Sequence, residues 1–143
     1  MRWRHPVIVC LMSALSPVPA ASGEGGVSVR DAWIREMPPG MTMTAGYMEL
    51  RNNTSRQQVL AAASSSVFDS VTVHRTIVKD GMASMVHVSQ IELAPNASLI
   101  FAPGGNHLML MNPEQTLRAG DPVVINLEFR GGLVLPVAFE VRK

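Results

Sequence analysis

At 143 residues, of which 47% are hydrophobic, the chain is long enough for one domain with a substantial core and too short for two such domains. Its formal net charge of +1 offers no broad basic surface of the kind that binds nucleic acid or anionic lipid. We therefore expect one domain and no nucleic-acid partner.

The first segment, MRWRHPVIVCLMSALSPVPAASGEGG, has the pattern of a secretory signal peptide. Two arginines precede an apolar run at 7–15, and small residues follow at 20–22. The run is too short to cross a bilayer as a helix, and no later segment approaches about 20 apolar residues. We expect residues 1–22 to be a signal peptide, residues 23–143 to form the exported mature domain, and no membrane span.

The only cysteine of the chain, Cys10, lies inside this apolar run and away from the expected cleavage site. The mature chain should therefore have no thiol, no disulfide and no lipid-modified cysteine. Eight of the ten methionines follow the leader, all of them between Met37 and Met111. That count is high for a small core in which methionine fills gaps.

The rest of the chain alternates short β-rich segments with turn sequences. In chain order the expected strands lie at 27–35, 45–52, 69–78, 84–93, 98–102, 107–112, 122–129 and 133–141. Glycine, proline and aspartate clusters such as MPPG, KDG, PGG and AGDP separate them. With no amphipathic helix in view, the pattern predicts an all-β fold, an antiparallel Greek-key β-sandwich of the cupredoxin-like or immunoglobulin-like kind.

Strand alternation separates the sulfur and imidazole side chains from the core. In HLMLM, Leu108 and Leu110 share one face, so His107, Met109 and Met111 share the other. By the same rule, Val71 and Val73 oppose Thr72 and His74, and Val86 and Val88 oppose Met85 and His87. We expect three strands to direct histidine and methionine away from the core.

The pair Asp80-Gly81 lies between two of these strands and is a strong hairpin signal. With this pair at the centre of the turn, Thr76 faces Met85 and His74 faces His87. His74 and Met85 then become diagonal neighbours, roughly 7 to 8 Å apart, which is close enough for their side chains to share an ion.

Four of these residues have a distinctive spacing. Ten residues separate His74 from Met85, twenty-one separate Met85 from His107, and one separates His107 from Met109. The chain resembles the periplasmic copper chaperones of the PCuAC type, whose signature is this H-x10-M-x21-H-x-M pattern. The similarity extends to DAWIR, AGYMELRN, VTVH, PGGNHLMLM and LRAGDPVVINLEF, and so covers most of the mature chain.

The resemblance implies that His74, Met85, His107 and Met109 bind one Cu(I) ion. Thioether sulfur is a soft donor that suits Cu(I), and imidazole also suits copper. As the family implies, the protein would deliver copper to the Cu(A) centre in subunit II of cytochrome c oxidase, directly or with a Sco-type thiol protein. Two alternatives stay open: an exported β-sandwich interaction module, and a copper-scavenging or tolerance protein with no delivery role.

Several motifs of other protein classes are absent from the sequence. The mature chain lacks the cysteine thiolate that blue-copper electron carriers require. It also lacks G-x-S-x-G, H-E-x-x-H and a glycine-rich phosphate loop. We therefore expect a carrier and not an enzyme.

Other methionines and one histidine lie outside this four-residue pattern. Met48 shares a face with Leu50 and should lie in the core. A secondary or alternate site could involve Met37, Met41, Met43, Met82, His87 or Met111, although methionines in the REMPPGMTMT loop could equally be solvated. One departure from the family is Arg75, since many relatives have methionine directly after the first histidine ligand; the added positive charge should weaken cation binding slightly or orient a partner.

Overall fold

The computed structural model describes residues 26–143, and the expected signal peptide and Cys10 lie outside these residues. Ten β-strands make up the fold: β1 (Val27–Arg35), β2 (Met43–Asn52), β3 (Gln58–Ser64), β4 (Phe68–Lys79), β5 (Met82–His87), β6 (Ile91–Leu93), β7 (Ser98–Phe101), β8 (Asn106–Pro113), β9 (Pro122–Phe129) and β10 (Val134–Arg142). In the described part of the chain we find no helix with the length and apolar character that a membrane crossing requires. The expected all-β sandwich is confirmed.

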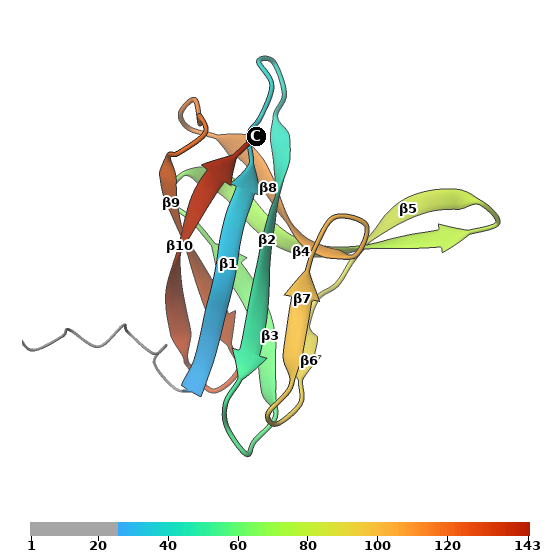
Figure 1. Ribbon diagram of the computed structural model, residues 1–143, viewed down its shortest axis with the longest axis vertical. Helices are drawn as coiled ribbons and strands as arrows, with labels where there is room; N and C mark the ends of the chain where they lie inside the picture. The colour runs from blue at the N-terminus through green and yellow to red at the C-terminus, as the bar shows by residue number, and fades with distance from the viewer. Residues whose placement is uncertain (1–25) are drawn as a thin grey trace, which may run out of the picture.

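The strands follow one another across the sheet in the order β5-β4-β8-β7-β2-β1-β10-β9-β3-β6. Additional pairings of β4 with β3 and of β8 with β2 curl this sheet into two facing layers. Most pairings are antiparallel, as expected, but β1 pairs with β10 and β7 with β8 in parallel. Figure 1 shows the layers side by side, with the first and last strands adjacent.

The core lies between the layers and is filled by alternate residues of nearly every strand. Leu108, Leu110, Ile125 and Leu127 are fully buried, and Phe101 and Phe139 are nearly so. Burial of this kind stabilises a fold by roughly 1.5 to 3 kcal/mol for each large apolar side chain. Met48, with 2% of its surface exposed, lies in this core, as its alternation with Leu50 predicts.

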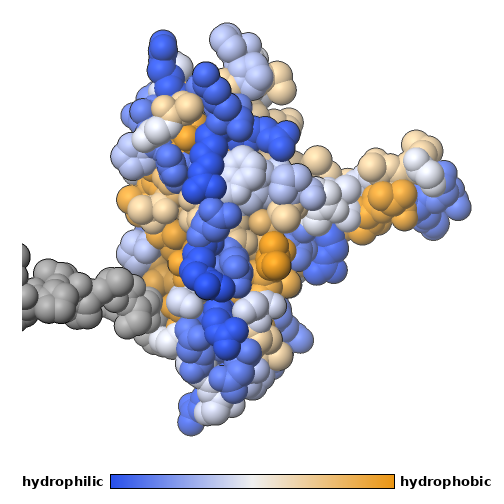
Figure 2. Space-filling model, viewed as in Figure 1, coloured by the Kyte–Doolittle hydropathy of each residue, from blue (hydrophilic) through white to orange (hydrophobic). Residues whose placement is uncertain are grey.

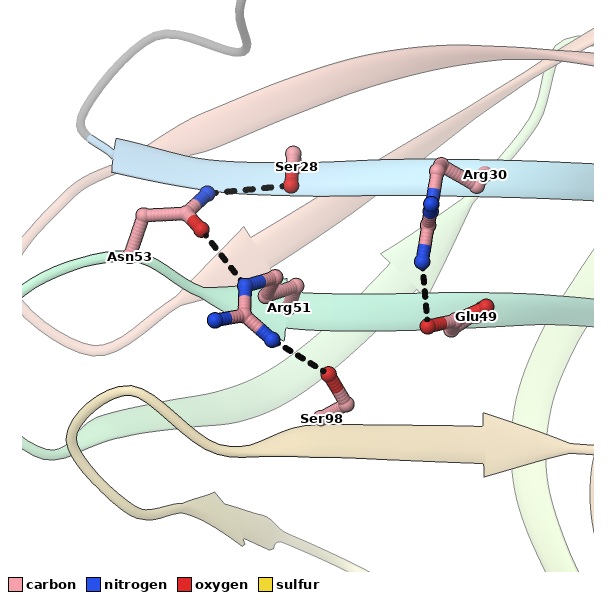
Figure 3. Close-up of polar contacts among 6 residues, drawn as sticks. All are labelled: Ser28, Arg30, Glu49, Arg51, Asn53 and Ser98. Carbon is pink, nitrogen blue, oxygen red and sulfur yellow. Dashed lines mark hydrogen bonds and ion pairs between the residues drawn. The ribbon is translucent and has the colours of Figure 1, made fainter.

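Polar side chains cover the outer surface of the layer that contains β1, β2 and β7. Arg30 donates a hydrogen bond to Glu49 across the β1–β2 pair at 2.9 Å. Figure 3 shows this contact beside a second group, in which Arg51 donates to Asn53 and to Ser98. The same surface is the blue stripe along the body in Figure 2. Its long polar side chains keep this face of the sheet in water.

Beyond Thr76, β4 leaves the body and pairs only with β5, forming a two-stranded arm (residues 77–84) that projects from the sandwich (Figure 1). Asp80 and Gly81 both have positive φ, 52° and 76°. Two such residues at the centre of a two-residue hairpin are typical of a type I′ turn, whose twist matches that of the strands. The predicted hairpin and its register are confirmed, with His74 opposite His87 and Thr76 opposite Met85.

Two expectations about strands need correction. The segment 84–93 is two strands, β5 and β6, and all six residues of β5 are exposed. Val86 does not enter the core, because β5 is an edge strand that pairs only with β4. Val88, just beyond β5, packs partly against the core. The alanine-rich strand β3 was not expected from the sequence. Alanine has a low preference for strands, so the sequence of β3 carries a weak β signal.

Candidate metal centre

The two candidate histidines lie side by side on neighbouring strands. His74 of β4 is the direct partner of His107 of β8 in an antiparallel pairing. Their ring centroids are 6.0 Å apart, with 27° between the ring planes. Val73 precedes His74 and Leu108 follows His107, and both of these neighbours are buried on the core side. Both imidazoles therefore lie on the face away from the core, as the alternation predicts.

Burial distinguishes the two histidines. Only 5% of the His107 surface is exposed, whereas His74 is half-buried. His107 does not face open solvent, although it points away from the core. It lines a cavity together with Tyr47 of β2, which is itself buried, and with Pro38 and Met41 from the segment between β1 and β2.

The two methionines approach the histidine pair from opposite sides. Met109 is half-buried on β8 and lies opposite Thr72 of β4, one alternate position from His107. Met85 lies on β5 opposite Thr76, and it is 60% exposed. Because His87 faces His74, Met85 is the diagonal neighbour of His74. Strands β4, β5 and β8 thus bring all four predicted residues to one face of the sheet.

Hydrogen bonds leave one nitrogen of each histidine without a partner. His107 Nδ1 lies 3.2 Å from the carbonyl oxygen of Gly105. A carbonyl only accepts, so we assign the proton to Nδ1, which leaves the lone pair on Nε2. His74 Nε2 lies 3.1 Å from Thr72 Oγ1. The other nitrogens, His107 Nε2 and His74 Nδ1, are buried and unpartnered.

A buried nitrogen without a hydrogen bond is costly, and native structures rarely leave one unexplained. Here two such atoms come from paired histidines on one face. Metal-binding histidines commonly use one nitrogen as ligand while the other donates to a carbonyl or another polar group, which fixes the tautomer. The residues present therefore fit a bound metal ion.

The surroundings also keep His74 neutral. Burial lowers the pKa of His74 below its ordinary value of 6.5, and the nearby charges of His107 and then His87 lower it further. Only the neutral imidazole has a lone pair to donate. His74 is thus ready to act as a ligand at a pH where an ordinary histidine would be partly protonated.

A cavity of about 360 Å³ connects part of this group to the surface. Three of the four predicted residues, Met85, His107 and Met109, line it, and His74 lies beside it through its pairing with His107. Tyr47 of β2 is a lining residue that the sequence analysis missed, and it is only 6% exposed. Ala45 is the partner of Met109, and Tyr47 lies two residues further along the same face of β2. The sequence would have placed Tyr47 beside the site only if the pairing of β2 with β8 had been known.

The secondary candidates fall in several places. The His87 ring lies 5.5 Å from that of His74, at the base of the arm. Met82 is 75% exposed beside the hairpin turn. Met41 and Met43 line the same cavity as His107, whereas Met37 lines two other depressions. Met111 is half-buried on the same face of β8 as Met109.

Arg75 does not point to the histidine pair. It alternates with His74 along β4, and its Nε donates a hydrogen bond of 2.9 Å to Asn106. Its guanidinium is therefore held on the other face of the strand. This arrangement reduces the effect of its charge on a cation bound beside His74.

The donors available at the site are soft. Within residues 26–143, no group of three or more histidine, cysteine, aspartate or glutamate side chains is arranged to hold a metal ion. Carboxylate and other oxygen donors select ions such as Ca²⁺ and Mg²⁺, whereas thioether sulfur selects Cu(I). The two imidazoles and two thioethers therefore suit Cu(I) better than Ca²⁺ or Mg²⁺.

Sequence relatives include two proteins that are identical to this chain at about a third of the aligned residues. "Putative lipoprotein Lxx21020" from Leifsonia xyli subsp. xyli is 34% identical over 118 residues, which cover 82% of this chain and 70% of that protein. "Uncharacterized protein RP573" from Rickettsia prowazekii is 32% identical over 87 residues, which cover 60% of this chain and 48% of that protein.

Solved structures with a similar fold include two that contain copper. The copper-bound PCuAC domain from PmoF2 matches with a TM-score of 0.70 and 24% identity over 82% of this chain and 93% of that domain, a likeness of fold alone. The solution structure of Cu(I)-bound DR1885 from Deinococcus radiodurans matches with a TM-score of 0.65 and 31% identity, over 78% of this chain and 75% of that one.

A family model described as "Putative lipoprotein LpqE-like" matches residues 27–141, which is nearly the whole described chain. A lipid anchor would require a modified cysteine, and Cys10 lies outside the described residues, so the expected absence of an anchor stays a prediction. The chain belongs to the LpqE-like family and shares the fold of copper-binding PCuAC domains.

Proposed function

We propose that this protein is an exported Cu(I) chaperone that holds one ion with His74, Met85, His107 and Met109. The observation that carries the proposal is the pair of histidines on adjacent strands, each with a buried nitrogen that has no hydrogen-bond partner. Met109 lies next to them on the same face, and Met85 lies diagonally across from His74. The Cu(I)-bound relative from Deinococcus radiodurans supports the choice of metal.

The ligand set explains why the ion would be Cu(I) and not Cu(II). Two thioethers and two imidazoles are neutral, soft-to-intermediate donors, and Cu(I) has a filled d shell that imposes no preferred geometry. Thioethers have no proton to lose, so only the imidazoles make binding sensitive to acid. Because Met85 is exposed, it is the ligand that a donor atom from a partner protein would replace first.

As for its destination, we propose delivery to the Cu(A) centre of cytochrome c oxidase subunit II, directly or with a Sco-type thiol protein. The mature domain would be residues 23–143, exported to the periplasm after loss of the signal peptide at 1–22. The role is that of a carrier and not of an enzyme. The lipoprotein descriptions of its relatives support export.

The first test is metal content after Cu(I) is supplied with a reductant and excess metal is removed. We expect one tightly held Cu(I) per chain, with much weaker retention of Cu(II). A protein that retains no copper would overturn the proposed function. Equal retention of both oxidation states would contradict the thioether ligands.

The second test is transfer. The copper-loaded protein is mixed with an isolated, metal-free Cu(A) domain, with and without a reduced Sco-type protein, and the copper in each protein is measured after separation. Copper on the Cu(A) domain supports delivery. Copper that stays on the chaperone in both mixtures would favour scavenging.

One observation favours an interaction module as the second candidate function. Ile77, Val78 and Met82 on the arm are exposed apolar side chains, and orange atoms on the arm stand out in Figure 2. Exposed apolar patches commonly mark surfaces that contact another protein. A chain that binds no copper, but whose pull-down partner is lost on replacing Val78 with Lys, would support this alternative.

A further inference from the structure

A second group of methionines lies along the same sheet face as the histidine pair. Met43 of β2 is the direct partner of Met111 of β8, and the next outward-facing pair on these strands is Ala45 with Met109. Met41 lies two residues before Met43, in the segment between β1 and β2. Directly opposite residues share a face, so the Met43 and Met111 side chains extend the row that begins with His107 and Met109.

The hydrogen-bond pattern brings Met43 and Met111 close together. The amide of Asn112 donates to the carbonyl of Thr42 at 2.7 Å, which makes the neighbouring pair, Met43 with Met111, a pair without hydrogen bonds. In antiparallel sheets the Cα atoms of such pairs lie about 4.5 Å apart, closer than in hydrogen-bonded pairs, and their side chains meet. The two sulfur atoms can therefore approach a common ion.

Exposure argues against a packing role for two of these methionines. Met41 and Met43 are 54% and 45% exposed, so they do not fill a core. Both line the cavity that also reaches His107 and Met109. Arg35 and Glu36 line this cavity as well, and the Glu36 carboxylate accepts a hydrogen bond of 3.0 Å from the amide of Ala119. The thioethers of Met41 and Met43 are soft donors at this rim.

From this geometry we infer a second soft-cation site, formed by the thioethers of Met41, Met43 and Met111, that takes Cu(I) or the chemically similar Ag(I). Thioether sulfur is a neutral, soft donor that suits Cu(I) and similar ions, whereas oxygen ligands suit Ca²⁺ and Mg²⁺. None of its three donors belongs to the proposed histidine-containing site, so neither site requires the other. With no imidazole in its shell, the second site should be the weaker one.

Its position gives the second site a use in loading. Two residues along a strand span about 7 Å, so an ion held by Met43 and Met111 would lie one such step from Met109. Met41 and Met43 of the second group line the same cavity as His107 and Met109 of the first, and Met41 is exposed. An ion captured at the rim would pass from sulfur to sulfur toward the buried His107.

The test uses Ag(I), which does not change oxidation state, and NMR of protein labelled with ¹³C at the methionine methyl groups. Two successive transitions are expected. The first shifts the methyl signals of Met85 and Met109, and the second, at least about tenfold weaker, shifts those of Met41, Met43 and Met111. The methyl of Met82, an exposed methionine away from the cavity, should not move and serves as the internal control.

Two variants make the assignment decisive. Replacing Met43 and Met111 together by leucine preserves side-chain volume and should abolish the second transition while leaving the first intact. Replacing His107 by Ala and Met109 by Ile should abolish the first and keep the second. A second transition that survives the leucine variant, or a titration that ends at one ion without shifting Met41, Met43 or Met111, would overturn this site. Loss of the Met85 and Met109 shifts alone would instead count against the proposed function.

Discussion

The two halves of β4 obey the same alternation but have opposite surroundings. In the inner half, Val71 and Val73 are buried between the layers. In the outer half, Ile77 and Val78 are of similar character, yet Val78 is 72% exposed because the arm has no second layer beneath it. His74 lies where one half gives way to the other. A strand that leaves its sandwich can thus offer ligands at the junction that are neither sealed in the core nor fully solvated.

The core beneath the inner half, where Leu110 of β8 is the partner of Val71, should carry most of the stability. Replacing Leu110 by Ala removes a fully buried side chain and should lower the free energy of unfolding by about 2 to 5 kcal/mol. Met111 is the next residue but faces the other side of β8, so the Met111→Ala variant should lose much less. Urea denaturation of both variants measures the difference, and equal losses would mean that the two faces of β8 are not distinct.

The side chains around this junction should bind copper, and replacing one of them should have little effect on stability. Met109 of β8 is one of them, two residues from His107, the partner of His74. Replacing Met109 by Ile keeps an apolar side chain of similar volume but removes the thioether. Loss of a residue that only supports a ligand typically costs 10- to 100-fold in metal affinity, so loss of a ligand should cost about 100-fold or more. Cu(I) affinity is measured by competition with a chelator under reducing conditions.

The control for this prediction is Met82→Ile, an equivalent change on the arm that should leave Cu(I) affinity unaltered. Thermal unfolding of the metal-free Met109→Ile protein should match that of the unsubstituted protein. A large drop in its melting temperature would make Met109 a packing residue and would remove the basis for placing it among the ligands.

The sequence predicts local features of this fold well. Alternation correctly places Leu108 and Leu110 in the core, and the Asp80-Gly81 turn fixes the partners of His74 and Thr76, because both depend on residues close together in the chain. The two parallel pairings and the strand β3 could not be predicted, since they depend on strands far apart in sequence and, in β3, on alanines with little β preference.

The candidate site shows the same division. The spacing and alternation indicate the face on which His74, Met85, His107 and Met109 lie. They give no sign that His107 is buried, because its neighbours in the cavity come from β2 and from the segment between β1 and β2, which lie far away in the sequence. The pairing of Met43 with Met111 was hidden for the same reason: it joins residues 68 positions apart, through strands whose register no local pattern reveals.

A matched pair of substitutions compares the two halves of β4 directly. Replacing Val73 by Thr introduces a hydroxyl of the same shape into the core, where an unpaired polar group costs about 1 to 3 kcal/mol. The same change at Val78 on the arm should alter the free energy of unfolding by less than about 0.5 kcal/mol. Chemical denaturation of the two variants provides the measurement, and a large loss for Val78→Thr would mean that the arm packs against something in solution.

The smallest expected effect is the pH dependence that His74 gives to the metal-free protein. Burial first, then the charges of His107 and His87, lower its pKa below 6.5 in the folded state. The unfolded chain therefore takes up a proton at His74 more readily than the folded chain does. The contribution of His74 to the free energy of unfolding is complete above pH 6.5 and is lost as the pH falls from there through the folded-state pKa.

The free energy of unfolding, measured in steps from pH 7.5 to about 5, should show this loss, and His74→Gln should reduce it. His87→Gln, which removes only the smallest of the three causes, should leave most of it. An unchanged slope in His74→Gln would show that the environment of His74 does not penalise its charged form, and copper binding would then gain no resistance to acid from this histidine.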